Sequence, residues 1–262
     1  MVFRVVAKYH PSLARAPAAA LRCGMVLPSH ISLQYFPISG RAQPLRNALR
    51  DAGVLFMDMQ IPLPNWPNLR DDPAIGGPYK ALPTLQWGEA QLAEALPIAA
   101  FLSGEMGHDH ALPSVEVARR AGIISCCYLE IMQPAGMLIW ADVFVPGATP
   151  EGLLPVFAGR MLAKLDALEV GAPEEGFIGE ARPVMADFYL EDAYCIMAHL
   201  LGPDAHEGLA RRLPRMAALA GRVQRREALR EPDAARPAAF TARPNEAEVV
   251  ARLHTVGPGV LG

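Results

Sequence analysis

The chain has 262 residues, of which 52% are hydrophobic and 19% are charged, and its formal net charge is −3. A hydrophobic fraction of this size supports a buried core and excludes a disordered chain, while the small net charge gives no general attraction to nucleic acid or to an anionic membrane. No stretch reaches the ~18 apolar residues of a membrane span, so the sequence predicts a soluble protein.

Residues 1–28 differ in composition from the rest of the chain. They hold four Lys or Arg residues and no acidic residue, and the first carboxylate of the chain is Asp51. A basic, acid-free leader is typical of an organelle transit peptide. The alternative is an upstream extension with Met25 as the functional start, because residues 25–30 run directly into the first predicted strand. Both interpretations predict a disordered segment over residues 1–28.

From residue 31 onward the pattern becomes regular. The predicted elements are a strand at 31–36, a helix at 41–52, a strand at 54–61, an irregular loop at 62–78, hairpin strands at 82–87 and 91–93, and a helix at 95–105. Pro37 ends the first strand, Pro44 is tolerated in the first helical turn, and Gly53 is a typical helix stop. This β-α-β, then β-β-α order predicts an α/β domain over residues 29–107, with a parallel, right-handed crossover.

Strand signals end after Gly107. Long segments with helical periodicity then cover residues 115–140, 152–168, 185–201 and 205–222. We therefore expect an all-helical domain over residues 113–235, separated from the first domain by a linker at 108–113. Residues 236–262 are expected to form a C-terminal tail.

Cysteine and histidine spacing gives no sign of a metal site. The chain holds four cysteines, Cys23, Cys126, Cys127 and Cys195. They form no C-x-x-C pair, so we interpret them as reduced thiols in a reducing compartment. His108 and His110 stand close together in the linker but have no third ligand at useful spacing, and a solvated linker is the better interpretation.

Several motifs in order resemble one protein family. Residues 35–46 (Tyr-Phe-Pro-Ile-Ser-Gly-Arg-Ala-Gln-Pro-Leu-Arg) resemble the opening of the tyrosine-type glutathione transferases, the alpha, mu, pi and sigma classes. Further resemblances are Trp66 with Arg70, the stretch 77–83 ending in Leu-Pro, and the segments 91–98, 186–188 and 213–216. Order and spacing agree over residues 31–235. The resemblance implies the cytosolic glutathione transferase fold, an α/β thioredoxin-like domain followed by an all-α domain.

The chemistry of that family needs a group that stabilises a thiolate. The free glutathione thiol has a pKa near that of cysteine, ~8.5, so the attacking thiolate is scarce at neutral pH. A tyrosine hydroxyl that donates to the sulfur favours the charged form. The resemblance assigns this catalytic role to Tyr35 at the end of the first strand. The alternatives are a purely structural tyrosine, or Ser39 as the donor, in the manner of serine-type relatives.

The resemblance also implies a binding site for the rest of glutathione. Its residues would be Tyr35, Arg41, Trp66, Arg70, Ala81, Leu82, Pro83, Glu94 and Ala95, with Pro83 following a cis peptide bond. The family's Gln-Ser pair is replaced by Glu94 and Ala95, and a family glutamine by Ala81. Glu94 can still accept from the ligand's ammonium group, but Ala95 has no hydroxyl, and one lost hydrogen bond to a charged group costs roughly 1.5–3 kcal/mol. Weak binding or a changed ligand is therefore the alternative expectation.

The helical domain offers an electrophile pocket by the same resemblance. Its predicted residues are Tyr128, Met132 and Trp140, on the first long helix, although a stripe of Met and aromatic residues is also typical of a plain core. Pro134 and Gly136 are expected to kink this helix. Asp187 resembles the family's buried aspartate near a helix start; since Val184 replaces the family's Ser or Thr, we expect a structural role for it.

The leading interpretation is an enzyme that joins glutathione to a hydrophobic electrophile, with no metal or other cofactor. One alternative is a non-catalytic protein of the same fold that binds ligands or serves as bulk structure, as lens relatives do; another is a glutathione-dependent isomerase of the sigma type. The family further implies a cytoplasmic homodimer with a detoxification role and no nucleic-acid or membrane partner.

Overall fold

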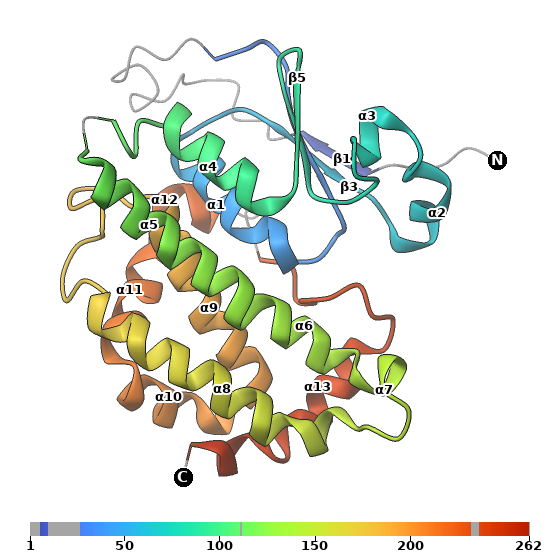
Figure 1. Ribbon diagram of the computed structural model, residues 1–262, viewed down its shortest axis with the longest axis vertical. Coiled ribbons are helices and arrows are strands. Elements are labelled where there is room, and N and C mark those ends of the chain that lie inside the picture. Colours follow the sequence, from blue (N-terminus) through green and yellow to red (C-terminus); the bar gives the residue numbers. More distant parts are fainter. Residues whose placement is uncertain (1–5, 10–26, 111, 232–235, 262) are drawn as a thin grey trace. The chain divides into compact units, whose positions relative to one another are not determined.

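The computed structural model describes residues 6–9, 27–110, 112–231 and 236–261. The chain divides into two compact units (Figure 1). The first comprises residues 1–113 and 225–238, and the second comprises residues 114–224 and 239–262. Each unit therefore contains a segment from the C-terminal quarter of the chain.

The first unit is built on a mixed sheet with the strand order β1-β3-β2-β4-β5. The strands are β1 (Val6–Tyr9), β2 (Ile31–Tyr35), β3 (Met57–Gln60), β4 (Thr84–Trp87) and β5 (Ala90–Ala93). β2 and β3 pair in parallel and are joined by helix α1 (Gln43–Asp51), which confirms the expected crossover, while the remaining pairs are antiparallel. Helix α4 (Ala95–Glu105) follows the hairpin of β4 and β5, as predicted.

Apolar side chains from the sheet and both helices form the core of this unit. Leu33 and Leu85, which face each other across β2 and β4, are fully buried. Leu45 of α1 and Leu102 of α4 are also fully buried. Alternating strand positions and helical i, i+4 positions supply this core because their side chains return to the same face.

The loop expected at 62–78 is more regular than predicted. It contains the 3-10 turn η3 (Leu63–Asn65) and the short helices α2 (Trp66–Leu69) and α3 (Pro73–Gly76). Each has a proline in its first turn, where the missing N–H removes no hydrogen bond. Prolines that were interpreted as loop residues therefore begin helices.

Strand β1 lies within the segment 1–28 that was expected to be disordered. Residues 1–5 and 10–26 lie outside the described residues, but β1 pairs antiparallel with β3 from Val6 opposite Gln60 to Tyr9 opposite Met57. For these four residues the structure differs from the expectation. Backbone hydrogen bonds along β3 explain why the strand forms without any sequence signal beyond Val5-Val6.

The regular elements described in the second unit are helices, and one isolated β-bridge occurs between Phe177 and Glu180. Its elements are α5 (Ser114–Cys126), η4 (Cys127–Met132), α6 (Gln133–Ile139), α7 (Ala141–Phe144), α8 (Pro150–Gly171), α9 (Met185–Leu201), η5 (Pro203–Ala205), α10 (His206–Arg212), α11 (Pro214–Gln224), α13 (Glu246–His254) and η7 (Gly257–Val260). Helix α9 is the central element and packs against α5, α11 and α13. Most of its residues are buried, including Phe188 and Leu200.

The first long helix of this unit changes its winding in the middle. Segment η4 is a π-helix, in which the N–H of Gln133 bonds to the carbonyl of Tyr128, five residues earlier. The wider turn comes directly before Pro134, which has no N–H and whose ring crowds the carbonyl four residues back. The irregularity expected at Pro134 is therefore a π-helical segment.

The run from Ser114 to Ile139 is, among the described helices, the one long and apolar enough to cross a membrane by length and composition. The sequence prediction did not find it because charged residues interrupt the apolar run. Within the unit it packs as a core helix, with Ile131, Leu138 and Ile139 fully buried.

The C-terminal region differs from the tail and domain boundary that were expected. Residues 225–238 belong to the first unit, where α12 (Glu227–Arg230) packs on α1 and Arg226 Nε lies 2.5 Å from Asp51 Oδ1. Residues 239–261 fold onto the helical unit, and Val249 and Leu253 of α13 are fully buried.

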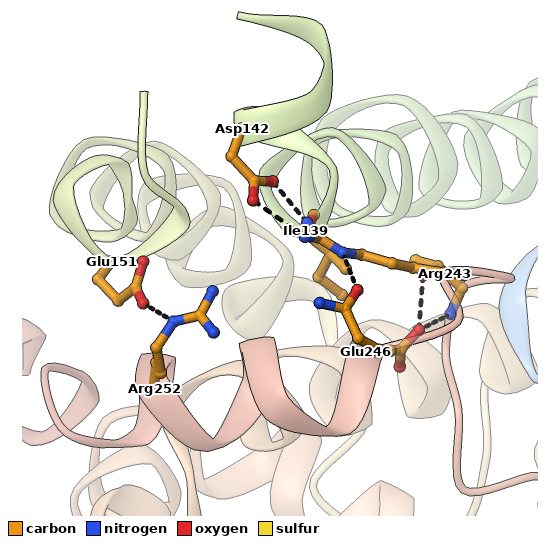
Figure 2. A network of polar contacts seen from close by, with 8 residues as sticks. Ile139, Asp142, Glu151, Arg243, Glu246 and Arg252 are labelled. Carbon is orange, nitrogen blue, oxygen red and sulfur yellow. Dashed lines mark hydrogen bonds and ion pairs between the residues drawn. The ribbon is translucent and has the colours of Figure 1, made fainter. Parts of the chain in front are cut away.

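A network of polar contacts around two buried charged residues, Arg243 and Glu246, holds this last segment (Figure 2). The Arg243 guanidinium donates to both carboxylate oxygens of Asp142, at 2.6 and 2.9 Å, and to the carbonyl of Ile139. The Glu246 carboxylate accepts from the N–H groups of Phe240 and Thr241 at 2.6 and 2.5 Å. Charged residues that resemble a solvated tail in the sequence are thus buried because each has partners.

Candidate functional site

Tyr35 is the last residue of β2, and its side chain is only 4% exposed. The chain turns directly after it through η2 (Gly40–Ala42) into α1, and Gly40 has the positive φ of 35° that this turn needs. The turn brings the backbone N–H of Arg41 to 3.0 Å from the Tyr35 hydroxyl oxygen. The hydroxyl thus acts as an acceptor within this turn, and a tyrosine hydroxyl also carries one proton that it can donate.

A buried ion cluster from α1 and β3 lies against Tyr35. Arg46 Nε donates to both oxygens of Asp58 at 3.1 Å, and Arg50 Nη2 lies 3.6 Å from Asp58 Oδ2. Arg46 also donates to the carbonyls of Ile38, at 2.7 Å, and Phe36, at 3.2 Å. The sequence analysis missed this cluster; two arginines four residues apart on a helix, with an aspartate in the next strand, are the signal that could have found it.

The opposite side of the candidate site comes from β4 and the start of α4. The Leu82–Pro83 peptide bond is cis, as the resemblance implied, and the carbonyl of Pro83 accepts from the N–H of Glu94 at 3.1 Å. Glu94 has a φ of 73°, an uncommon value for a residue with a side chain. Ala81, just before this stretch, donates its N–H to the carbonyl of Gly76.

Arg41 and Glu94 bring opposite charges together between these two parts. Arg41 Nη1 lies 3.7 Å from Glu94 Oε2, with side chains 44% and 36% exposed. Ala95, the first residue of α4, is fully buried, so its contribution to a ligand would be its backbone N–H at the helix start. The structure thus connects Tyr35, Arg41, Glu94 and Pro83 through direct contacts.

The remaining residues predicted for the first unit are Trp66, Arg70 and Ser39. The Trp66 ring contacts the Phe36 ring edge-on, with 5.8 Å between centroids, and Phe36 follows Tyr35. Arg70 is exposed and lies 4.0 Å from the carboxylate of Asp71. Ser39, the alternative donor, is buried, and its carbonyl accepts from Gln43.

The predicted electrophile residues of the helical unit are mostly interior. Tyr128 and Met132 lie in η4 and are 5% and 3% exposed, a degree of burial typical of a core. Trp140 is partly exposed; its ring stacks on Phe144 at 6.0 Å, and the Arg243 guanidinium lies 5.9 Å from its centroid. Of these three residues, Trp140 has the side chain that a ligand of this unit can reach.

Asp187 binds backbone amides at the start of α9. Its Oδ1 accepts from Ile178 at 2.9 Å, and its Oδ2 accepts from Val184 at 2.8 Å. Burial raises the pKa of the Asp187 carboxyl to about 6, although the N–H bonds from Ile178, Val184 and Gly179 act in the opposite direction. These contacts support the expected structural role.

No metal-ligating group of three or more His, Cys, Asp or Glu side chains occurs among the described residues.

No family model matches the chain. Glutathione S-transferase P 1 of Xenopus laevis is 30% identical over 118 residues, which are 44% of this chain and 53% of that protein. S-crystallin 3 of Enteroctopus dofleini is 31% identical over 107 residues, 40% of this chain and 46% of that protein. The chain thus matches about half the length of these curated relatives.

Solved structures show the same fold over more of the chain. The glutathione S-transferase from Ascaris lumbricoides has a TM-score of 0.64 at 21% identity and covers 82% of this chain and 100% of its own. A rat hPGDS complexed with a quinoline has a TM-score of 0.59 at 20% identity and covers 76% and 93%. The fold is therefore that of the glutathione transferases, a thioredoxin-like unit with a helical unit, as predicted. The chain is thus similar in sequence to part of these glutathione S-transferase and S-crystallin relatives, and it has the glutathione transferase fold.

Proposed function

We propose that this protein is a glutathione transferase in which Tyr35 stabilises the thiolate of glutathione for attack on a hydrophobic electrophile. The observation that carries the proposal is the Arg41 N–H bond to the Tyr35 hydroxyl at the end of β2. A tyrosine hydroxyl can accept from an amide and donate its own proton at the same time, and a donor of this kind favours a thiolate over a thiol. Proteins of this family use glutathione as co-substrate and need no prosthetic group.

The other contacts suggest how the tripeptide is held. The backbone of Leu82, before the cis Pro83, offers hydrogen-bonding groups to the cysteinyl part of glutathione, as an added strand does. Glu94 offers a carboxylate for the ligand's ammonium group, and the Ala95 N–H at the start of α4 offers a donor for its α-carboxylate. Arg41, whose side chain is almost half exposed beside Glu94, supplies a positive charge at the same end.

Outer contacts complete the proposed site. Trp66 and Arg70 belong to the part that meets the glycine end of glutathione, and Ala81 borders the cysteinyl part. Within the helical unit, the proposed electrophile residues are Tyr128, Met132 and Trp140, of which Trp140 is partly exposed. The reaction needs no oxidant or reductant. The thiol proton leaves to solvent, the sulfur forms one new bond to the electrophile, and the bond between the electrophile and its leaving group breaks.

A non-catalytic role is the second candidate, because two observations favour it. Ala81 and Ala95 remove polar side chains from the proposed glutathione site, and one matched relative is a crystallin. The isomerase alternative is supported by a structural neighbour described as a prostaglandin synthase, which has a TM-score of 0.57. A transferase, an isomerase and a non-catalytic protein of this kind would all have the same fold, so a measurement of activity is needed to distinguish them.

The test is retention of the purified protein on immobilised glutathione, together with turnover of a chloronitrobenzene. We expect the wild type to be retained and to turn over the substrate. A folded wild type that neither binds nor turns over would refute the enzyme and favour a structural protein. Retention with isomerisation of an endoperoxide, but no conjugation, would favour the isomerase.

Assembly and location complete the proposal. We expect a homodimer in the cytoplasm, with a role in detoxification, as the family suggests. Sedimentation velocity of the full chain tests the dimer: a single monomeric species at micromolar concentration would contradict it.

A further inference from the structure

Lys80 has an uncommon backbone conformation. Its φ is 53°, in the left-handed region that a residue with a Cβ rarely adopts. It is the fourth residue of a turn in which its N–H bonds to the carbonyl of Gly77 at 3.4 Å, and the next N–H, that of Ala81, bonds to the carbonyl of Gly76 at 3.0 Å. Glycine would adopt this conformation without strain. The turn itself therefore gives no reason for a lysine.

The ion pair of Lys80 with Asp71 does not account for the lysine either. Lys80 Nζ lies 2.7 Å from Asp71 Oδ1, and the side chains are 64% and 58% exposed. The hydrogen bond from Lys80 and its positive charge lower the pKa of the Asp71 carboxyl below its usual value. Ion pairs between exposed side chains nevertheless add little to stability. Backbone strain that gains so little stability in return is typical of a functional position.

Strained residues border the segment around Pro83. Among the described residues other than glycine, three have a positive φ, namely Lys80, Glu94 at 73° and Glu180 at 63°. Lys80 precedes Pro83 by three residues, and the N–H of Glu94 bonds to the Pro83 carbonyl at 3.1 Å. Glu180 belongs to the helical unit. Two of these three residues are therefore next to one segment of the candidate site.

The chain places Lys80 within reach of the end of β2. Thr84 stands opposite Gln34, the residue before Tyr35, and its hydroxyl oxygen lies 3.0 Å from Gln34 Oε1. Lys80 precedes Thr84 by four residues, a length of chain that spans at most about 14 Å. A tripeptide with its thiol at Tyr35 extends over roughly 10 Å. The flexible Lys80 side chain can therefore meet one end of such a ligand.

Arg70 belongs to the same group of charges. Its Nε lies 4.0 Å from Asp71 Oδ2, so Asp71 has a cation on each side. Arg70 follows Trp66 by one helical turn, and the Trp66 ring contacts that of Phe36. The cluster of Arg70, Asp71 and Lys80 carries two positive charges and one negative charge on exposed side chains. Its charge thus fits one further carboxylate.

We propose that Lys80 is a specificity-determining residue that binds the glycine carboxylate of glutathione, and that Asp71 competes with this carboxylate for Lys80. The inference rests on the proposed transferase function. The ligand carboxylate replaces Asp71 at the Lys80 ammonium group and has Arg70 as a second cation. Because the turn fixes the Lys80 backbone before the ligand arrives, binding costs less conformational freedom. The site then selects thiol peptides that end in a free carboxylate.

Calorimetric titration of the full-length protein with glutathione, and with its ethyl ester at the glycine carboxylate, tests this role. We expect the wild type to bind glutathione about tenfold more tightly than the ester. Lys80→Gly should weaken glutathione binding about tenfold and leave ester binding unchanged. Asp71→Asn removes the competing carboxylate and should strengthen glutathione binding about threefold, again without an effect on the ester.

Thermal unfolding distinguishes this role from a structural one. Lys80→Gly should raise Tm by about 2–4 °C, because glycine relieves the left-handed strain, although it weakens binding. Glu180→Gly is the matched control, since it makes the same backbone change in the helical unit. It should raise Tm similarly and leave glutathione binding unchanged. A lower Tm in Lys80→Gly would show that the lysine stabilises the turn and would overturn the proposal.

The two proposals can fail separately. A wild type that binds neither glutathione nor its ester refutes the proposed transferase function, and the role of Lys80 falls with it. A wild type that binds both ligands equally well refutes only the role of Lys80. Unchanged glutathione binding in Lys80→Gly, or an equal loss for glutathione and the ester, has the same consequence.

Discussion

The backbone N–H of Arg41 donates to the Tyr35 hydroxyl oxygen at 3.0 Å, across a turn of six residues. This bond does not use the Arg41 side chain, which instead lies near Glu94. Backbone and side chain of one residue therefore serve different parts of the proposed site, and they can be separated by mutation.

Replacement of Arg41 by proline and by alanine distinguishes these two contributions. Arg41→Pro removes the N–H at a position in the first turn of a helix, where proline is tolerated, and should lower kcat about tenfold. Arg41→Ala keeps the N–H and should raise KM for glutathione with little change in kcat. Steady-state kinetics of the two variants provide the measurement. Equal kcat values in both would show that the backbone bond to Tyr35 has no role.

Ala95→Ser should strengthen glutathione binding. The serine hydroxyl would add a donor beside the first N–H of α4, and a hydrogen bond to a charged carboxylate is worth roughly 1.5–3 kcal/mol, so KM should fall about tenfold. Ala100→Ser is the matched control, because it makes the same change at an exposed position of the same helix. If KM is unchanged in Ala95→Ser, another group already binds that carboxylate.

The buried carboxyl of Asp187 should make stability depend on pH. Its folded pKa is about 6, above the ordinary value of 3.8, so the folded state binds the proton more tightly than the unfolded state. This contribution is complete below about pH 4 and is lost as the pH rises through 6, with a total of about 3 kcal/mol. Urea unfolding of the wild type and Asp187→Asn from pH 4 to 7 measures it. A difference between the two proteins that does not vary with pH would contradict the assignment.

Arg243→Met should destabilise the helical unit. The guanidinium is buried and binds Asp142 and the Ile139 carbonyl, so its removal leaves acceptors without a donor and should cost about 2–4 kcal/mol in urea unfolding. Arg211→Met is the control: Arg211 pairs with Glu207 on the surface, where both side chains are mostly exposed, and its loss should cost less than about 0.5 kcal/mol. Equal effects would mean that residues 239–261 are a tail, as the sequence suggested.

Local sequence signals predicted the helices and strands around the site. Helix α4 has the bounds expected for it, and α9 likewise, because periodic apolar residues and turn residues mark them within a single window. The cis Leu82–Pro83 bond followed from the resemblance rather than from composition. The placement of Tyr35 at a strand end needed only the Pro37 stop and the glycine of the following turn.

Buried charges could not be predicted in the same way. Arg46 and Arg243 each find their partners in another element, Asp58 on β3 and Asp142 on α7, and a charged residue alone is correctly assigned to the surface in most cases. Helix α13 did carry a local signal, since Val249 and Leu253 are four residues apart and both buried. The polar residues on either side of α13 led to the prediction of a tail instead.

The titration of glutathione bound to the protein tests the central claim most directly. Ultraviolet absorbance of the thiolate, followed against pH in the wild type and in Tyr35→Phe, gives the pKa of the bound thiol in each. We predict a pKa at least one unit below the ~8.5 of a free thiol in the wild type, and a return toward that value in Tyr35→Phe. Tyr79→Phe, which removes the hydroxyl of an exposed tyrosine, should match the wild type. The same pKa in wild type and Tyr35→Phe would contradict the role of Tyr35.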